Sequence, residues 1–389
     1  MKYFSHLNTA VSIIKLYRWE QPFHHFIKEF FRQNKKYGSS DRKNITQLCY
    51  CYFRLGKSFP GLPPDERILT GLFLCSRAPN ELLAHLKPEW NAASTAKPEE
   101  KCLLLNTSVD LLSIFPVAEE LSNGIDTRSF FLSHLEQPDL FIRIRPGFRE
   151  KVVDKLNTAK LEYLFLNDDC IALPNTTKID NILEGDKEVV IQDESSQRIG
   201  EMIPERAMFN KAPAPFVWDC CAASGGKSIM AKDKLGDIQL TVTDIRESIL
   251  ANLKNRFIAA GIKDYYGYLA DLTKGAPKAI EQQFDLIIAD LPCSGSGTWG
   301  RTPEQLCVFE SKQIVVYNEL QKKILTNITL QLKKQGYLLY ITCSVFKKEN
   351  ESIVAFIQKQ FSLRLLKMEV MKGYENKADT MFAALLIKD

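Results

Sequence analysis

The sequence predicts an α/β protein in which a doubly wound, Rossmann-like sheet follows two smaller domains. Apolar residues recur at helical spacing over residues 1–125, and short strands mix with a helix over residues 126–192. Strands then alternate with helices over residues 193–389, which is typical of a parallel sheet covered by helices. We therefore expect three domains with these boundaries.

The composition is that of an ordinary globular protein. Of the 389 residues, 45% are hydrophobic and 25% are charged. No apolar run approaches the roughly 20 residues of a membrane helix, and the first residues do not resemble a signal peptide. The net charge of +4 permits nucleic-acid binding without requiring it. We expect a cytoplasmic protein that binds no membrane.

The cysteines and histidines exclude several kinds of site. None of the ten cysteines forms a Cys-x-x-Cys pair, and no histidine lies at zinc-ligand spacing, so no metal is expected. The last histidine is His134. A Ser-His-Asp or Cys-His mechanism is therefore disfavoured in the region that follows.

The first domain is predicted to be a helical bundle. Ser40-Asp41 is a suitable N-cap, and Pro63-Pro64 can open a helix. The polar residues 91–100 are expected to form a loop. The predicted helices span residues 10–17, 23–31, 45–55 and 68–75.

The second domain is predicted to be a small α+β unit. Its expected strands are residues 140–144, 163–166, 171–172 and 189–191, with a helix over 148–156. The stretch Arg143–Lys151 is locally basic. It is either a solvated strand edge or a contact to an RNA backbone.

The third domain is predicted to carry the main sheet. Its expected strands are residues 216–219, 240–244, 266–269, 284–290, 336–342 and 381–387, and its expected helices include 247–260, 303–332 and 349–359. Ligands of such sheets bind beyond the carboxyl ends of the strands.

A glycine-rich turn follows the first of these strands, in the segment Asp219–Ser228. A phosphate-binding loop would need glycine at position 221, where this chain has Cys221. A structural turn and a turn that holds another nucleoside-like cofactor remain open. Asp244 ends the next strand and could accept both ribose hydroxyls, or cap the following helix. Asp271 follows the third strand and could accept a hydrogen bond from an adenine amino group.

Two cysteines lie at the same expected edge of the sheet. Cys293 follows Asp290 in the sequence Asp-Leu-Pro-Cys-Ser-Gly-Ser-Gly, and Cys343 lies in Tyr-Ile-Thr-Cys-Ser. A single cysteine at a strand end is usually structural. Two of them beside a cofactor turn favour a chemical role.

These segments resemble the motifs of the RsmB/Sun/Fmu family of ribosomal RNA cytosine-5 methyltransferases. The family's cofactor loop, Cys-Ala-Ala-Pro-Gly-Gly-Lys, corresponds to Cys221–Lys227, with serine in place of proline. The resemblance implies a methyltransferase that uses S-adenosylmethionine. The residues that it assigns to cofactor binding are Cys221, Ala222, Ala223, Ser224, Gly225, Gly226, Lys227, Asp244, Asp271 and Asp290.

The resemblance also implies roles for the two cysteines. Cys343 is expected to attack carbon 6 of cytosine, Cys293 to assist release of the product, and Asp290 to contact the base and the cofactor. Lys227 and Arg301 could favour the thiolate, or could simply be solvated. The target cytosine must be unpaired or flipped out of its stack.

The N-terminal helices resemble the NusB-like RNA-binding domain that is fused to this enzyme in RsmB. By this analogy the substrate is RNA, most simply small-subunit ribosomal RNA, and the protein is expected to be a monomer. Two other hypotheses remain. Gly226-Lys227-Ser228 could belong to a P-loop-like ATPase, or a degenerate domain could serve only to bind RNA.

Overall fold

Three separate segments of the chain form one folded unit, and three others form a second. The computed structural model describes residues 2–105, 111–209 and 214–389. The helical unit comprises Met1–Glu119, Asp126–Gln137 and Thr298–Ser311, and the sheet unit comprises Glu120–Ile125, Pro138–Gly297 and Lys312–Asp389. The helical unit thus includes a segment from the predicted third domain. The division into three domains stays a prediction.

Amphipathic helices build the helical unit around aromatic side chains. Phe23, Phe53 and Phe73 are fully buried in one hydrophobic cluster of this unit. The helices are α1 (Lys2–Leu16), α2 (Phe23–Gln33), α3 (Ser39–Arg54), α4 (Pro64–Cys75), α5 (Glu81–Leu86), α6 (Pro88–Ala92), α7 (Pro98–Leu104), α8 (Thr127–Ser133) and α13 (Gln305–Val308). Burial of these apolar side chains is the main force that holds the unit together.

One prediction for this unit was partly wrong. Residues 91–100 were expected to form a loop, but α6 extends to Ala92 and α7 begins at Pro98. Proline in the first turn of a helix has no N–H to leave unpaired, and the Glu100 carboxylate accepts the Lys97 N–H at 3.1 Å. A polar stretch therefore starts a helix here.

The small sheet of the second region is antiparallel, with the strand order β2-β3-β1-β4. Its elements are β1 (Leu140–Ile144), α9 (Arg149–Thr158), β2 (Leu164–Phe165), β3 (Cys170–Leu173) and β4 (Val189–Ile191). Ile142, Val152 and Ile171 are buried between this sheet and α9. The predicted α+β character of this region is confirmed.

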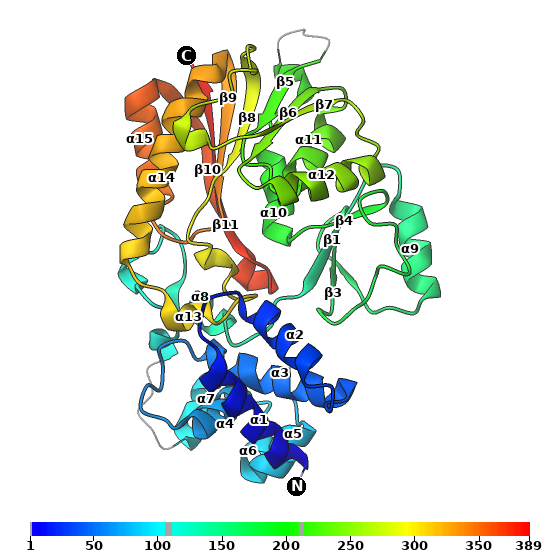
Figure 1. Ribbon diagram of the computed structural model, residues 1–389, viewed down its shortest axis with the longest axis vertical. Helices are drawn as coiled ribbons and strands as arrows, with labels where there is room; N and C mark the ends of the chain where they lie inside the picture. Colours follow the sequence, from blue (N-terminus) through cyan, green and yellow to red (C-terminus); the bar gives the residue numbers. More distant parts are fainter. Residues whose placement is uncertain (1, 106–110, 210–213) are drawn as a thin grey trace. The chain divides into compact units, whose positions relative to one another are not determined.

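Seven strands form the main sheet in the order β10-β11-β9-β8-β5-β6-β7 (Figure 1). The five strands from β9 to β7 are parallel, whereas β11 runs antiparallel to both β9 and β10. The elements are α10 (Glu194–Arg198), β5 (Phe216–Asp219), α11 (Gly226–Leu235), β6 (Gln239–Asp244), α12 (Glu247–Ala260), β7 (Tyr265–Leu269), β8 (Phe284–Asp290), α14 (Lys312–Ile328), β9 (Leu332–Thr342), α15 (Glu351–Phe361), β10 (Leu363–Lys372) and β11 (Thr380–Lys388).

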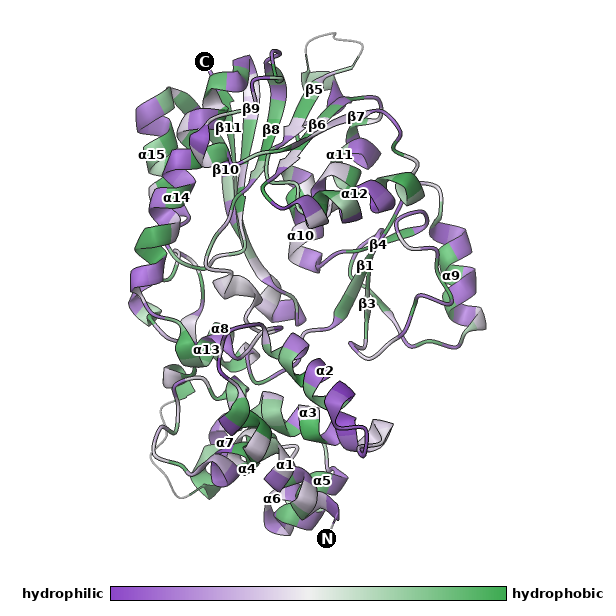
Figure 2. Cartoon of the chain, viewed as in Figure 1, coloured by the Kyte–Doolittle hydropathy of each residue, from purple (hydrophilic) through white to green (hydrophobic). Residues whose placement is uncertain are grey.

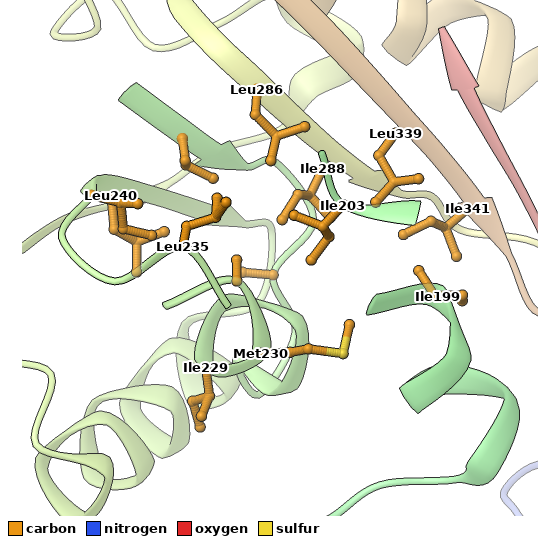
Figure 3. Packing of buried hydrophobic residues seen from close by; sticks show 14 of the residues in the cluster. Ile199, Ile203, Ile229, Met230, Leu235, Leu240, Leu286, Ile288, Leu339 and Ile341 are labelled. Atoms are coloured by element: carbon orange, nitrogen blue, oxygen red, sulfur yellow. The ribbon is translucent and has the colours of Figure 1, made fainter. Parts of the chain in front are cut away.

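Helices cover both faces of the main sheet, as a doubly wound fold requires. On one face, α11 and α12 pack against the strands, and Ile229 and Met230 of α11 belong to the same buried cluster as Ile288 of β8 (Figure 3). On the other face, α14 and α15 cover Trp218 and Tyr340. The central strands β8 and β9 are accordingly largely hydrophobic, with hydrophilic residues towards their ends (Figure 2).

Three sequence predictions for this sheet need correction. β10 was not predicted, the last strand is antiparallel, and the single helix expected over 303–332 is interrupted. Residues 298–311 belong to the helical unit, so α14 begins only at Lys312. The strand β9 begins at Leu332, where the helix was expected to end.

The first two arginines of the basic stretch Arg143–Lys151 do not form a solvated strand edge. Arg143 and Arg145 have side chains that are 10% and 13% exposed, and each forms an ion pair with Asp233 of α11, at 2.8 and 2.7 Å. The two arginines thus join the small sheet to the main one. In the described part of the chain, no helix is long and apolar enough to cross a membrane.

Candidate active site

Four neighbouring strands bring the predicted residues to one edge of the main sheet. In the order β9, β8, β5 and β6, each strand pairs in parallel with the next. Their carboxyl ends carry Thr342, Asp290, Asp219 and Asp244. Residues separated by more than 120 positions in the sequence therefore line one edge.

The glycine-rich turn after β5 is tight and rests on the neighbouring strand. The Ala222 N–H donates to the Thr243 carbonyl at 2.9 Å. Ala223 and Gly225 have φ angles of 46° and 86°, in the left-handed region. A Cβ at Gly225 would lie 2.6 Å from Cε1 of Phe257, so only glycine fits there.

Asp244 stabilises this turn from the end of β6. Its carboxylate accepts the Ala223 N–H at 3.0 Å and hydrogen bonds from the backbone and the guanidinium of Arg246. Burial opposes ionisation, but the hydrogen bonds and charge of Arg246 hold the pKa of Asp244 below its usual value. Asp244 is thus an ionised acceptor at the sheet edge.

Asp271 follows β7 and begins a short 3₁₀ turn. Its carboxylate accepts hydrogen bonds from the backbone N–H and the hydroxyl of Thr273, at 3.1 and 2.7 Å. These hydrogen bonds lower the pKa of Asp271, with help from Lys274. In the structure Asp271 caps this turn.

Lys227 and Asp290 form an ion pair between the turn and the end of β8. The Lys227 Nζ lies 2.5 Å from Oδ2 of Asp290, and its side chain is only 11% exposed. Burial opposes the charge, but Asp290 and Asp219 raise the pKa of Lys227. Lys227 is thus a charged residue of the site and is not simply solvated. Arg301 lies in the helical unit.

The two candidate cysteines lie side by side. Sγ of Cys293 is 3.2 Å from Sγ of Cys343, and both side chains are partly exposed. The hydrogen bond to Cys343 and burial raise the pKa of Cys293 well above its usual value. Cys293 therefore keeps its proton, whereas Cys343 has a hydrogen-bond donor beside its sulfur.

Close backbone contact holds the two cysteine turns together. The Gly297 N–H donates to the Cys343 carbonyl at 2.9 Å. A Cβ at Gly297 would lie 1.8 Å from the Thr380 carbonyl oxygen, so the turn after Cys293 could not otherwise approach β9 and β11. Glycine at this position allows the sulfurs to meet.

Sequence reasoning missed several residues that support this site. Glu349 and Gln321 are fully buried beneath the cysteine turns, and Arg256 donates to the Ser224 hydroxyl at 2.8 Å. The only feature of the sequence that could have pointed to Glu349 was its position, six residues after Cys343. A glutamate near a helix start usually faces solvent.

The donor and acceptor groups at this edge suit a nucleoside cofactor with an amino-acid tail. Helix α11 begins at Gly226, and the first N–H groups of a helix have no intrahelical partner, which suits a carboxylate. Asp244 offers a buried carboxylate for ribose hydroxyls. Among the described residues, no three His, Cys, Asp or Glu side chains are grouped as a metal ion requires.

A family model described as 16S rRNA methyltransferase RsmB/F matches residues 206–386. This part of the chain is similar to the RsmB/F family. The match covers the glycine-rich turn, both cysteine turns and the main sheet from β5 to most of β11. Several proteins that are similar to the chain are named ribosomal RNA small subunit methyltransferase B.

Curated relatives match about half of the chain and are themselves longer than the matched part. Ribosomal RNA small subunit methyltransferase B of Xanthomonas campestris is 29% identical over 54% of this chain and 50% of its own length. Human NSUN6, named tRNA (cytosine(72)-C(5))-methyltransferase, is 31% identical over 43% of this chain and 38% of its own length. The chain thus spans about half or less of these relatives.

Solved structures share the fold. The crystal structure of PH0851 covers 98% of this chain and 98% of its own, with a TM-score of 0.72 and 19% identity. NSun6 from Pyrococcus horikoshii, solved with SFG, covers 70% of this chain with a TM-score of 0.57 and 15% identity. At these identities the comparison supports the architecture alone.

Proposed function

We propose that this protein transfers a methyl group from S-adenosylmethionine to carbon 5 of a cytosine in RNA. The observation that carries the proposal is the 3.2 Å distance between the sulfurs of Cys293 and Cys343. They lie at the carboxyl ends of adjacent parallel strands, next to the Asp290–Lys227 ion pair. The RsmB/F match and the cytosine-5 activity in the name of NSUN6 support the same reaction.

The cofactor residues are proposed from the turn and the strand ends around it. We assign Cys221–Lys227, Asp244, Asp271 and Asp290 to the binding of S-adenosylmethionine, which supplies an electrophilic methyl group when bound. The first N–H groups of α11 donate to the carboxylate of the amino-acid tail, and the Asp244 carboxylate accepts hydrogen bonds from the ribose hydroxyls. Asp271 accepts the adenine amino group.

The chemistry needs a nucleophile because carbon 5 of cytosine is unreactive on its own. The Cys343 thiolate adds to carbon 6, which makes carbon 5 an enamine carbon that can take up the methyl group. Carbon 5 then loses its proton to a base, and the carbon–sulfur bond breaks to release Cys343. Cys293 retains its proton and sits beside the sulfur, so we assign it to the release step.

RNA that carries 5-fluorocytosine tests the covalent step. Fluorine at carbon 5 cannot leave as a proton does, so the adduct with Cys343 is expected to persist on denaturing gels. Cys343→Ala should form no adduct, whereas Cys293→Ala should accumulate one even with ordinary RNA. An adduct that survives in Cys343→Ala would contradict the assignment.

The substrate is proposed to be small-subunit ribosomal RNA, the RNA named for the bacterial relatives. The cytosine must be unpaired or flipped to expose its face to Cys343. The protein is proposed to act as a cytoplasmic monomer. Mapping 5-methylcytosine in ribosomal and transfer RNA, with and without this protein, tests the substrate. Light scattering tests the oligomeric state.

A further inference from the structure

Below the two cysteine turns lies a group of buried polar side chains that the proposed chemistry does not use. Glu349 is 0% exposed and lies between the turn that carries Cys293 and the turn that carries Cys343. A buried carboxyl is costly unless hydrogen bonds compensate for the lost water. Its partners therefore indicate its role.

Glu349 contacts the residue that follows each cysteine. Its Oε2 accepts the backbone N–H of Ser294 at 2.9 Å, and its Oε1 accepts the hydroxyl of Ser344 at 2.8 Å. One carboxyl group thus spans the two turns. The Ser294 and Ser344 hydroxyls also lie 3.1 Å apart, which closes a small ring of hydrogen bonds.

Gln321 of α14 extends the same connection to the other side of Cys293. Its Nε2 donates to the Pro292 carbonyl at 3.0 Å and to Glu349 at 3.2 Å. The Tyr340 hydroxyl donates to Gln321 and to the Glu349 carbonyl, at 3.2 and 2.5 Å. Both peptide groups that flank Cys293 are therefore held by one buried network.

Asn350 completes the network on the Cys343 side. It accepts the Thr342 hydroxyl at 2.6 Å and donates to the Ser344 carbonyl at 2.9 Å. Each cysteine is thus flanked on both sides by residues that this network binds. The sulfurs themselves remain free of it and face each other.

We infer that Glu349 is a positioning residue that fixes the distance between the Cys293 and Cys343 sulfurs by binding both turns. The inference rests on the proposed function. It extends that function by naming the group that keeps the nucleophile Cys343 and the release residue Cys293 at a fixed distance from each other. Burial raises the pKa of Glu349, and its hydrogen bonds from Ser294, Ser344 and Gln321 oppose the shift.

The test compares Glu349→Ala and Glu349→Gln in the full chain. Misplacing a reacting group by about 1 Å can cost roughly a hundredfold in rate, so Glu349→Ala should slow formation of the 5-fluorocytosine adduct by about that factor. RNA affinity should be unchanged. Glu349→Gln keeps an oxygen for the Ser294 N–H, so its rate should lie clearly nearer that of the natural protein.

A second measurement reports the sulfur distance without methyl transfer. The oxidant diamide removes two protons and two electrons from a close thiol pair, which forms a disulfide while diamide is reduced to its hydrazine. Formation of the Cys293–Cys343 disulfide, followed by peptide mass spectrometry, should be fast in the natural protein and markedly slower in Glu349→Ala.

Asn318→Ala is the matched control. Asn318 lies on α14, is buried, and donates to the Lys348 carbonyl at 2.5 Å; among the described residues, it forms no hydrogen bond to either cysteine turn. It should lower the melting temperature and leave the rates of adduct and disulfide formation in the folded protein unchanged.

The outcomes separate the two proposals. If the natural protein forms no adduct, the proposed function fails, and the diamide rates still test the positioning. If the adduct forms but Glu349→Ala reacts at the natural rate in both assays, the positioning role is wrong. Equal losses in Glu349→Gln and Glu349→Ala would also overturn it, because they would assign the effect to charge.

Discussion

At the scale of single residues, the site separates two chemically identical thiols by their surroundings. The hydrogen bond to Cys343 and partial burial raise the pKa of Cys293, and the nearby Glu349 carboxyl raises it further. The Lys227 ammonium is paired with Asp290. A thiolate is the reactive form of cysteine, so the raised pKa of Cys293 disfavours it as the attacking sulfur, in keeping with the role proposed for Cys343.

Short pulses of iodoacetamide at pH 8 are expected to label Cys343 before Cys293, because Cys293 keeps its proton. Peptide mass spectrometry measures the order of labelling. Cys49 and Cys220 are fully buried and serve as unlabelled references. Earlier labelling of Cys293 would reverse the assigned roles.

Asp219 is expected to make the stability of the protein depend on pH. Burial raises its pKa from 3.8 to about 7, although the Ser228 hydroxyl donates to it at 2.6 Å. Because the folded pKa is the higher one, its contribution to stability is full below about pH 4 and is lost as the pH rises to about 7.

Asp219→Asn should remove this dependence. Between pH 5 and pH 8, the natural protein should lose more free energy of unfolding than the variant, by an amount on the order of a few kcal/mol. Urea unfolding at both pH values measures the difference. Asp237→Asn is the control, because the Asp237 side chain is 80% exposed. Equal pH dependence in all three proteins would contradict the assignment.

At the scale of elements, the turn between β5 and α11 depends on glycine at one position and not at the next. A Cβ at Gly225 would clash with Phe257, whereas the nearest atom to a Cβ at Gly226 is an Arg256 nitrogen at 4.0 Å. Substitution of Gly226 can therefore serve as the control for substitution of Gly225.

Gly225→Ala is expected to lower the free energy of unfolding by about 1–3 kcal/mol, because the new Cβ overpacks the core and the φ angle is unfavourable. Gly226→Ala should fold with stability near that of the natural protein. Chemical unfolding of both variants measures this. Equal destabilisation by the two substitutions would show that the clash with Phe257 is not decisive.

The small sheet and α11 depend on one buried carboxylate. The Asp233 side chain is 8% exposed and pairs with both Arg143 and Arg145. Asp233→Ala should cost about 3–5 kcal/mol, because it leaves two buried guanidinium groups without their partner. Asp237→Ala breaks an exposed pair with Lys232, so it should cost at most about 1 kcal/mol. Thermal unfolding distinguishes the two.

The helices and strands also show how much of the fold could be predicted from the sequence. The strands over 140–144, 216–219 and 284–290 match the structure residue for residue, because buried strands have a strong apolar signal. β10 was missed, since most of its residues are exposed or partly exposed and its register shifts at Leu365. Arg143 and Glu349 were misread or missed because charged residues are rarely buried, and only tertiary contacts show their partners.

At the scale of the whole molecule, the chain leaves the Cys293 turn and enters the helical unit. Trp299 packs against Phe115, and the Glu304 carboxylate accepts the Phe23 N–H at 3.1 Å. Trp299 and Phe309 are buried in this setting. The segment 298–311 is therefore part of the helical core, although it lies between two strands of the main sheet in sequence.

A chain that lacks residues 1–137 is expected to aggregate, because Trp299, Leu306 and Phe309 lose the core that buries them. The soluble fraction after expression measures this. Changing these three residues to serine in the shortened chain should restore part of the soluble fraction. A well-folded shortened chain with the natural segment would contradict the expectation.

The interleaved segments also limit how such a protein can be recombined. A chimera that exchanges only the first 119 residues for those of a relative would place foreign helices around the native segment 298–311. Mismatched side chains would then meet where Arg54 donates to the Gly300 carbonyl. A functional chimera must therefore take all three segments of the helical unit from the same parent protein. Two of the exchange points then lie between β8 and β9, one on each side of residues 298–311.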